Sequence, residues 1–305
     1  MRSPTNISGF DSRFGNRQPV EGRHSVLHSD LARVEGISVA GLSREPMPVV
    51  HTPQFQVLFP LAGVFNWHLG ATVSLLNANQ ILFIAAGDES QDSHPGIGDV
   101  DGLLLTPGHA LLKSAWACDI HKLARAPGFA ERVLPSDPRL QQAAAALARY
   151  GARTPLLDEG VIEEAVVDLL AVTAAHAGAR SARFNNESKL ANAVKEIVSS
   201  CDQRLSLTDI GAQLGASPTY LTDAFRRSVG IPISQYHRRL RLARALTELP
   251  HTDDITALAL RFGFSSHAHF SSAFRDVFGR TPSEYRARVR KADIRSLLQR
   301  IEPVT

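Results

Sequence analysis

An imperfect duplication in the last third of this 305-residue chain restricts its fold more than any other feature. A phenylalanine, a glycine and a tyrosine each recur after 49 residues: Phe225 with Phe274, Gly230 with Gly279, and Tyr236 with Tyr285. The chain has only four tyrosines, so two of them in one register with a Phe and a Gly indicate a repeat rather than coincidence. We therefore predict two copies of one helical unit.

Each copy has the residue pattern of a helix-turn-helix unit. Three features occur at matching positions: a small residue that lets two helices approach (Gly211, Ala259), a glycine suited to a left-handed turn (Gly215, Gly263), and a serine N-cap for the second helix (Ser217, Ser266). Ser206, with Asp209 three residues later, predicts a capping box at the start of the first unit. Two generic helical hairpins would share part of this pattern, but its repetition favours DNA binding.

The second helix of each copy is predicted to read DNA. Successive residues of a helix are about 100° apart, so turning Leu221 and Phe270 inward leaves the opposite faces exposed. The predicted DNA-binding residues are Ser217, Thr219, Thr222, Asp223, Arg226 and Arg227 in the first copy and Ser266, His267, Ala268, Ser271, Ser272 and Arg275 in the second. Arginine suits guanine or phosphate, and Asp223 suits a cytosine amine. For His269 the angle favours an interhelical contact, and the His-x-His pair lacks a third metal ligand.

A helix predicted over Ser234–Leu249 joins the two units and sets their separation. Its four arginines either contact the DNA backbone or form a solvated face: Arg238, Arg239, Arg241 and Arg244. Charge supports contact with nucleic acid, because residues 201–291 hold 14 Lys and Arg against 8 Asp and Glu. That is a net of +6, whereas the remaining residues carry a net of −3. A basic domain beside a mildly acidic one is typical of nucleic-acid binders.

A family resemblance rests on one long pattern in this region. The pattern Arg239-Leu-Arg-Leu-Ala-Arg-Ala-Leu, followed by Ile255-x-x-Leu-Ala-x-x-Phe-Gly-Phe-Ser-Ser266 and the aromatic series to Tyr285-Arg286, resembles the C-terminal signature of the AraC/XylS family. The resemblance covers roughly Glu187–Lys291. It implies an all-α seven-helix domain, two recognition helices in successive major grooves, and activation or repression of transcription with RNA polymerase as a partner. Asp223 departs from the family pattern, which often has a polar or basic residue there.

The front of the chain has the pattern of an antiparallel barrel or sandwich. From Ile37 to Trp116, short apolar runs alternate with Gly and Asn turn signals: Phe55–Phe59, Val64–Trp67, Val73–Leu76, Ile81–Ile84, Leu103–Leu105 and Leu111–Leu112. Two helices are predicted next, one capped by Asp137 and ending by Gly151, the other running from Ile162 to about His176. This architecture resembles the cupin-type β-barrel sensing domain joined to AraC-type domains, which implies an α+β chain that binds a small-molecule effector and dimerises through the helices.

These patterns divide the chain into five segments. They are a flexible arm (1–20), a cupin-like sensing and dimerisation domain (21–177), a linker (178–186), the double helix-turn-helix domain (187–291) and a tail (292–305). No apolar run is long enough for a membrane span, no signal peptide is recognisable, and there are only two cysteines. We therefore expect a cytoplasmic protein without a membrane partner.

The sequence offers no catalytic constellation. The histidines of the front domain are scattered, so neither a metal nor another cofactor is expected. Phe65, Trp67 and Trp116 either line an effector pocket or belong to the core. We expect a DNA-binding regulator and not an enzyme; the alternatives are a cupin-like enzyme, or an adaptor whose helical domain contacts only proteins.

Overall fold

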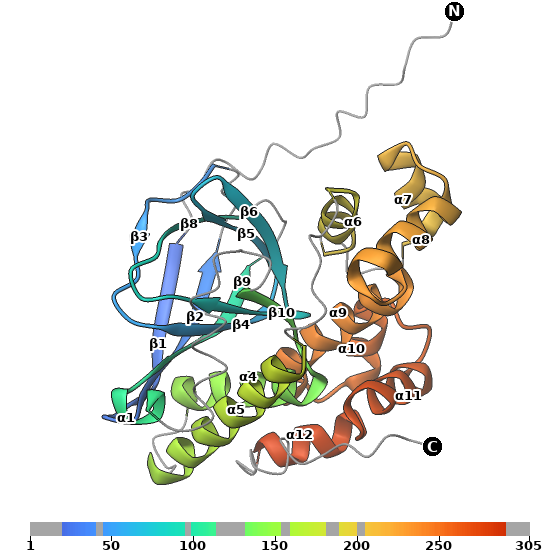
Figure 1. The fold of residues 1–305 in the computed structure, drawn as a ribbon. Helices are drawn as coiled ribbons and strands as arrows, with labels where there is room; N and C mark the ends of the chain where they lie inside the picture. Colours follow the sequence, from blue (N-terminus) through green and yellow to red (C-terminus); the bar gives the residue numbers. More distant parts are fainter. Residues whose placement is uncertain are drawn as a thin grey trace, which may run out of the picture.

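A computed structural model describes residues 20–40, 45–94, 99–113, 132–153, 159–180, 189–199 and 205–290. The predicted tail, nearly all of the predicted arm and Trp116 lie outside these ranges. Strands come first in the chain and helices follow, which confirms the predicted fold class (Figure 1).

Within the described ranges, ten strands form two antiparallel sheets. The first sheet has the order β1 (Val20–His28), β2 (Ala32–Ala40), β9 (Val100–Pro107), β4 (Gln56–Ala62), β7 (Gln80–Ile84) and β10 (Val133–Pro135). The second has the order β3 (Val50–His51), β8 (Glu89–Ser93), β5 (Val64–Leu69) and β6 (Thr72–Asn77). A shared apolar core joins Leu82 and Val100 of the first sheet to Phe65, Trp67 and Leu76 of the second. The two sheets therefore pack face to face, as in a cupin-like barrel.

The sequence patterns located five of the described strands and missed the other five, which are β1, β2, β3, β8 and β10. The runs predicted at Phe55, Val64, Val73, Ile81 and Leu103 correspond to β4, β5, β6, β7 and β9. By contrast, β1 and β2 carry alternating polar residues and contain no continuous apolar run. The run Leu111–Leu112 was wrongly grouped with the strands, because it ends the short helix α1 (His109–Leu112).

Helix α4 (Pro138–Arg153) lies between the first sheet and the C-terminal helices, and α5 (Glu159–Arg180) packs beside it (Figure 1). Leu140, Ala144 and Leu147 of α4 are fully buried. Asp137 precedes α4, and its Oδ1 accepts a hydrogen bond from the Arg139 backbone N at 2.8 Å. Burial raises the pKa of Asp137, but its hydrogen bonds with Arg139 outweigh this and lower the pKa overall. Helix α4 continues past Gly151, and α5 continues past His176 into the predicted linker.

Seven α-helices follow among the residues that the structure describes, the number that the resemblance implied. They are α6 (Lys189–Ser199), α7 (Leu207–Leu214), α8 (Pro218–Val229), α9 (Ile233–Glu248), α10 (Ile255–Arg261), α11 (His267–Phe278) and α12 (Pro282–Arg290), with a 3-10 turn, η1 (Leu249–His251), after α9. The first unit, α7 and α8, shares a core with α6 and the start of α9. The core of the second unit is continuous with that of α4, α5 and the first sheet. No described helix is both long enough and apolar enough to span a bilayer.

The turn between β6 and β7 enters the core of the first unit. Ala78 of this turn is buried in the same apolar cluster as Leu221 and Phe225. Asn77 is fully buried; its Nδ2 donates to Ser199 Oγ at 3.0 Å and to Tyr236 Oη at 2.9 Å. The Tyr236 hydroxyl also donates to Asn77 Oδ1 at 3.0 Å. The β-domain and the first unit are therefore joined by a buried network of hydrogen bonds.

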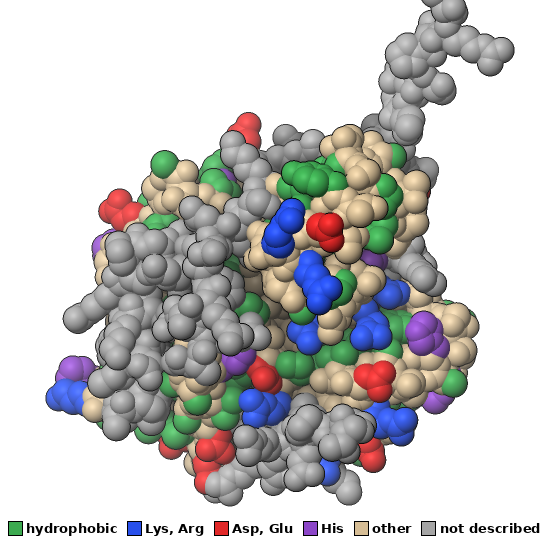
Figure 2. Space-filling model, turned by 45° about the vertical axis from the view of Figure 1, so that its right-hand side comes forward, with side chains coloured by type: hydrophobic (Ala, Val, Ile, Leu, Met, Phe, Trp, Pro, Cys, Tyr) green, Lys and Arg blue, Asp and Glu red, His purple; other side chains and the backbone are tan. Residues whose placement is uncertain are grey.

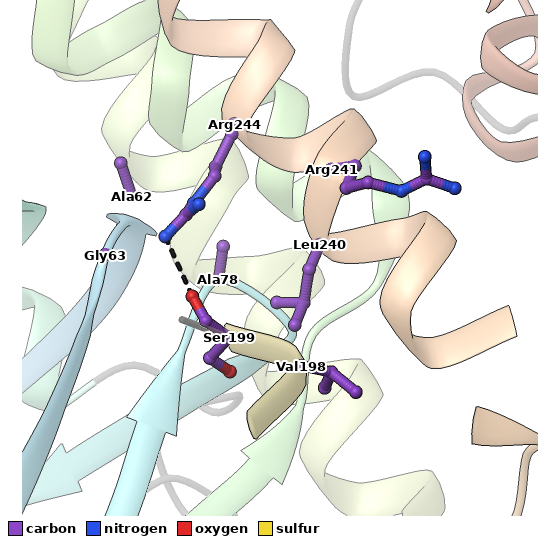
Figure 3. Close-up of a pocket in the computed structure, with 8 residues that line it drawn as sticks. All are labelled: Ala62, Gly63, Ala78, Val198, Ser199, Leu240, Arg241 and Arg244. Atoms are coloured by element: carbon purple, nitrogen blue, oxygen red, sulfur yellow. Dashed lines mark hydrogen bonds between the residues drawn. The ribbon is translucent and has the colours of Figure 1, made fainter. Parts of the chain in front are cut away.

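Further contacts tighten this junction. Asn79 Nδ2 donates to the carbonyl oxygen of Tyr236 at 3.1 Å, and Gln141 of α4 donates to the carbonyl oxygen of Ala78 at 2.6 Å. Figure 3 shows the adjoining cavity, where Arg244 donates to the carbonyl oxygen of Ser199 at 3.0 Å. The cavity measures about 10 Å³, room for one water molecule at most. The junction between the β-domain and the first unit is therefore closely packed.

Candidate nucleic-acid interface

The first helix-turn-helix unit is shaped by two serine caps and a glycine turn. The Ser206 hydroxyl accepts a hydrogen bond from Asp209 N at 3.0 Å, and the Asp209 carboxylate accepts one from Ser206 N at 3.4 Å, which completes the predicted capping box. Gly215 ends α7 with φ of 63°. A Cβ on Gly211 would lie 2.5 Å from the carbonyl oxygen of Ala216, so only glycine fits at this position of α7, which packs against the turn leading into α8.

The second unit repeats this plan with one extra residue in its turn. Asp254 caps α10 by accepting hydrogen bonds from Thr256 N and Ala257 N at 2.9 and 3.0 Å. Gly263 has φ of 69°, and Ser266 caps α11 by accepting a hydrogen bond from His269 N at 3.1 Å. The position equivalent to Gly211 is held by Ala259, which is fully buried. The longer turn therefore accommodates a methyl group that the first unit excludes.

The predicted reading faces lie on the surface. Ten of the twelve predicted DNA-binding residues are exposed: Ser217, Thr219, Asp223, Arg226, Arg227, Ser266, His267, Ala268, Ser272 and Arg275. The other two, Thr222 and Ser271, are half-buried. Sequence reasoning missed Tyr220, whose exposed fraction is 57% at the start of α8. It is one of the few large apolar side chains that are exposed in the described part of the chain, and its place just after the Ser217-Pro218 cap is the signal that could have identified it.

Some of the predicted DNA-binding side chains form hydrogen bonds within their own helix, whereas others have donors that no described group occupies. The hydroxyls of Ser217 and Ser266 serve as helix caps, and Thr222 Oγ1 donates to the carbonyl oxygen of Pro218 at 2.9 Å. Arg226 and Arg275 are 49 residues apart, directly after Phe225 and Phe274, and so occupy equivalent positions of the repeat. Neither guanidinium has an ion pair or hydrogen bond within the described ranges. Both are free to donate to a ligand.

His269 does not make the interhelical contact that was predicted. The side chain is exposed, its Nδ1 lies 3.0 Å from Ser265 Oγ, and its ring meets that of Phe264 edge-on at 5.5 Å. The angular argument failed because the neighbouring turn, rather than another helix, lies beside this face.

The arginines of α9 have different roles. Arg241 is buried and donates to the carbonyl oxygens of Phe262 and Gly263 at 3.0 and 2.9 Å, with its guanidinium 4.7 Å from the Phe264 ring. Arg244 contacts Ser199, as described above. These two arginines therefore hold the two units and α6 in place, a structural role that neither of the two alternatives from the sequence included. Figure 2 shows several Lys and Arg side chains near the middle of the molecular face that it presents.

The front domain contains the other predicted residues. Phe65 and Trp67 are buried between the sheets, with exposed fractions of 6% and 4%, and Phe65 packs 6.2 Å from the His94 ring. Both contribute to the core, and Trp116 lies outside the described residues. Within the described ranges, no three His, Cys, Asp or Glu side chains are grouped as metal ligands.

The C-terminal region of the chain is similar to known helix-turn-helix proteins. The family described as "Helix-turn-helix domain" matches residues 210–288. The chain is 34% identical over 106 residues to the HTH-type transcriptional activator RhaR of Mannheimia succiniciproducens, covering 34% of this chain and 38% of the relative. It is 38% identical over 84 residues to the HTH-type transcriptional activator AarP of Providencia stuartii, covering 27% of this chain and 62% of that protein. The matches thus span less than two thirds of either relative.

A solved structure adds to this comparison. A transcriptional regulator of Chromobacterium violaceum, described as having an AraC-type DNA-binding domain, is 38% identical over 33% of this chain and 91% of its own, with a TM-score of 0.31. The sequence matches, the duplicated helix-turn-helix geometry and the AraC/XylS signature coincide on the same residues. The C-terminal domain of this chain therefore belongs to the AraC/XylS family of helix-turn-helix domains.

Proposed function

We propose that this protein is a sequence-specific DNA-binding regulator of transcription. The supporting observation is the equivalence of α8 and α11: each follows a glycine turn, is capped by serine, and presents one unpaired arginine at the same position. In helix-turn-helix proteins, side chains near the start of such a helix contact base edges in the major groove. Two units joined by one rigid helix suit two successive turns of duplex.

The chemistry of the exposed residues fits this proposal. Arg226 and Arg275 suit bidentate contacts to guanine, and the exposed Thr219 and Ala268 suit thymine methyl groups. Asp223 would accept from a cytosine amine and repel a phosphate placed beside it. We infer that the caps, Ser217 and Ser266, position their helices and add contacts to the backbone.

The β-domain is proposed to sense a signal. We propose the division already described: residues 21–177 for sensing and dimerisation, 178–186 as linker, and 187–291 for DNA binding. A small-molecule effector, a homodimer and contact with RNA polymerase are parts of this proposal. We place the protein in the cytoplasm with no catalytic activity of its own. The adaptor alternative would keep the two units but make no use of duplex DNA.

Selection from a pool of random duplexes tests the proposal. The full-length protein should enrich one sequence family that covers two major-groove segments on one face of the duplex. On the enriched duplex, Arg275→Ala should weaken binding by about 1–3 kcal/mol and relax selection at one base pair. Arg33→Ala, a half-exposed arginine of β2, is the matched control and should bind normally. Enrichment of no sequence would refute the proposed function.

A further inference from the structure

A groove separates the beginning of α9 from the turn that leads into α11. Its volume is about 730 Å³; Ser234, Gln235 and Arg238 line it from α9, and Gly263, Ser265 and His269 line it from the other side. Arg241 also lines it, and no Asp or Glu is among its described lining residues. The groove therefore combines positive charge with hydroxyl, amide and imidazole groups that can donate hydrogen bonds.

Arg238 has a buried donor that no described group of the protein satisfies, as do Arg239 and Arg241 at their Nε atoms, but Arg239 and Arg241 make other contacts. Its Nε is buried without a hydrogen-bond partner, and its guanidinium makes no ion pair or hydrogen bond in the described chain. Arg241, one turn further along α9, is held by the carbonyl oxygens of Phe262 and Gly263. A buried donor without a partner is costly, so Arg238 is best explained by a ligand that supplies an acceptor.

The position of the groove indicates the ligand. Ser265 and His269 flank the start of α11, beside the exposed reading residues His267 and Ala268. The opposite wall is α9, the helix that connects the two units. The groove therefore lies beside the helix that connects α8 to α11, and we infer that a duplex contacting both would pass it between its two major-groove segments. The part of DNA available there is the sugar-phosphate backbone, whose anionic oxygens accept hydrogen bonds from Arg, Ser, Gln and His.

We propose that this groove binds the DNA backbone between the two reading sites, with Arg238 as a phosphate ligand. The proposal rests on the proposed function and adds a contact outside the two recognition helices. A phosphate carries no sequence information, so Arg238 contributes affinity and register rather than choice of bases. An acidic protein segment or free phosphate would present a similar charge, and the experiment below distinguishes them from DNA.

The first test is the salt dependence of binding. Arg238→Gln should lower the slope of log affinity against log salt concentration by about 0.9, the value for one phosphate contact, and weaken binding about tenfold at 0.1 M salt. The loss should be equal for the enriched duplex and a random duplex. Arg238→Lys should recover part of the affinity, and Arg33→Gln, the control on β2, should leave slope and affinity unchanged. Thermal melting of each variant establishes that it is folded.

The second test locates the phosphate. Neutral methylphosphonate linkages are placed one at a time along the enriched duplex. Wild-type protein should lose affinity at one linkage between the two reading sites, and Arg238→Gln should show no further loss there. Replacing chloride by phosphate at constant ionic strength should not affect the variant's binding differently from that of the wild type.

Three results would overturn the proposal. An unchanged salt slope would exclude the phosphate contact, and a loss confined to the enriched duplex would make Arg238 a base reader. Loss of binding to an acidic peptide with no change for DNA would assign the groove to a protein partner. These outcomes are independent of the selection experiment: the wild-type protein can enrich a sequence while Arg238 proves irrelevant, and a failed selection refutes the function first.

Discussion

Removing the side chain of Asn77 should loosen the first helix-turn-helix unit from the β-domain. In Asn77→Ala, the Tyr236 hydroxyl and the Ser199 hydroxyl both lose their Asn77 partner, and each residue is only 3% exposed. Each buried polar group that loses a hydrogen-bond partner costs roughly 1–3 kcal/mol, so the variant, which affects two such hydroxyls, should lose about 2–6 kcal/mol of unfolding free energy. Tyr236→Phe removes one hydroxyl but keeps the edge-on contact with Phe225 at 5.4 Å, and should lose about 1–2 kcal/mol.

The double variant shows whether these losses come from one shared hydrogen bond. If they do, Asn77→Ala combined with Tyr236→Phe should lose about 1–2 kcal/mol less than the sum of the single variants. Urea unfolding monitored by circular dichroism measures all four proteins. Tyr220→Phe is the matched control: this tyrosine is 57% exposed, and its replacement should change stability by less than about 0.5 kcal/mol. Additive losses, within about 0.5 kcal/mol, would refute the reasoning.

Two further changes test the second unit. Phe274→Ala should destabilise the protein by about 3–5 kcal/mol, because Phe274 is fully buried against Phe278 and Tyr285 with ring centroids 4.6 and 5.9 Å apart; an unchanged melting temperature would contradict this packing. Hydrogen bonds from Thr281 at the start of α12 lower the pKa of Glu284 below its usual value of 4.5. The ionised carboxylate therefore stabilises the fold above about pH 4.5, and this contribution is lost as the pH falls through the folded-state pKa. The stability difference between wild type and Glu284→Ala, measured by urea unfolding, should therefore be largest near neutral pH and shrink in acid; a constant difference would exclude the ionised form.

Much of the C-terminal fold could be predicted because its signals are local. Caps such as Ser206 and Ser217, and glycines such as Gly215, act within a few residues of their own position. The same locality explains the errors. Strands β1 and β2 pair through backbone hydrogen bonds that leave little trace in side-chain patterns, and α1 is too short for a helical period.

The junction and the groove could not be predicted from sequence. Asn77 and Asn79 looked like turn residues, and only tertiary structure reveals that their side chains bind Tyr236. Likewise, nothing in the arginine-rich pattern of α9 distinguishes Arg241, which holds two carbonyl groups, from Arg238, which holds none. The exposed faces of α8 and α11 were accessible to angular arguments because each helix buries one regular stripe.

The helices that carry the two tyrosines of the duplication contact different parts of the front domain. Tyr236 is tied to the β6–β7 turn, whereas Tyr285 is buried near Tyr150 of α4, whose hydroxyl donates to the carbonyl oxygen of Val289. The front domain thus contacts the two helix-turn-helix units through separate elements. A shift of the sheet would reach the first unit through the β6–β7 turn. A shift of α4 would reach the second unit. Under the proposed function, a signal that acts through only one of these contacts would change one helix-turn-helix unit and leave the other unchanged.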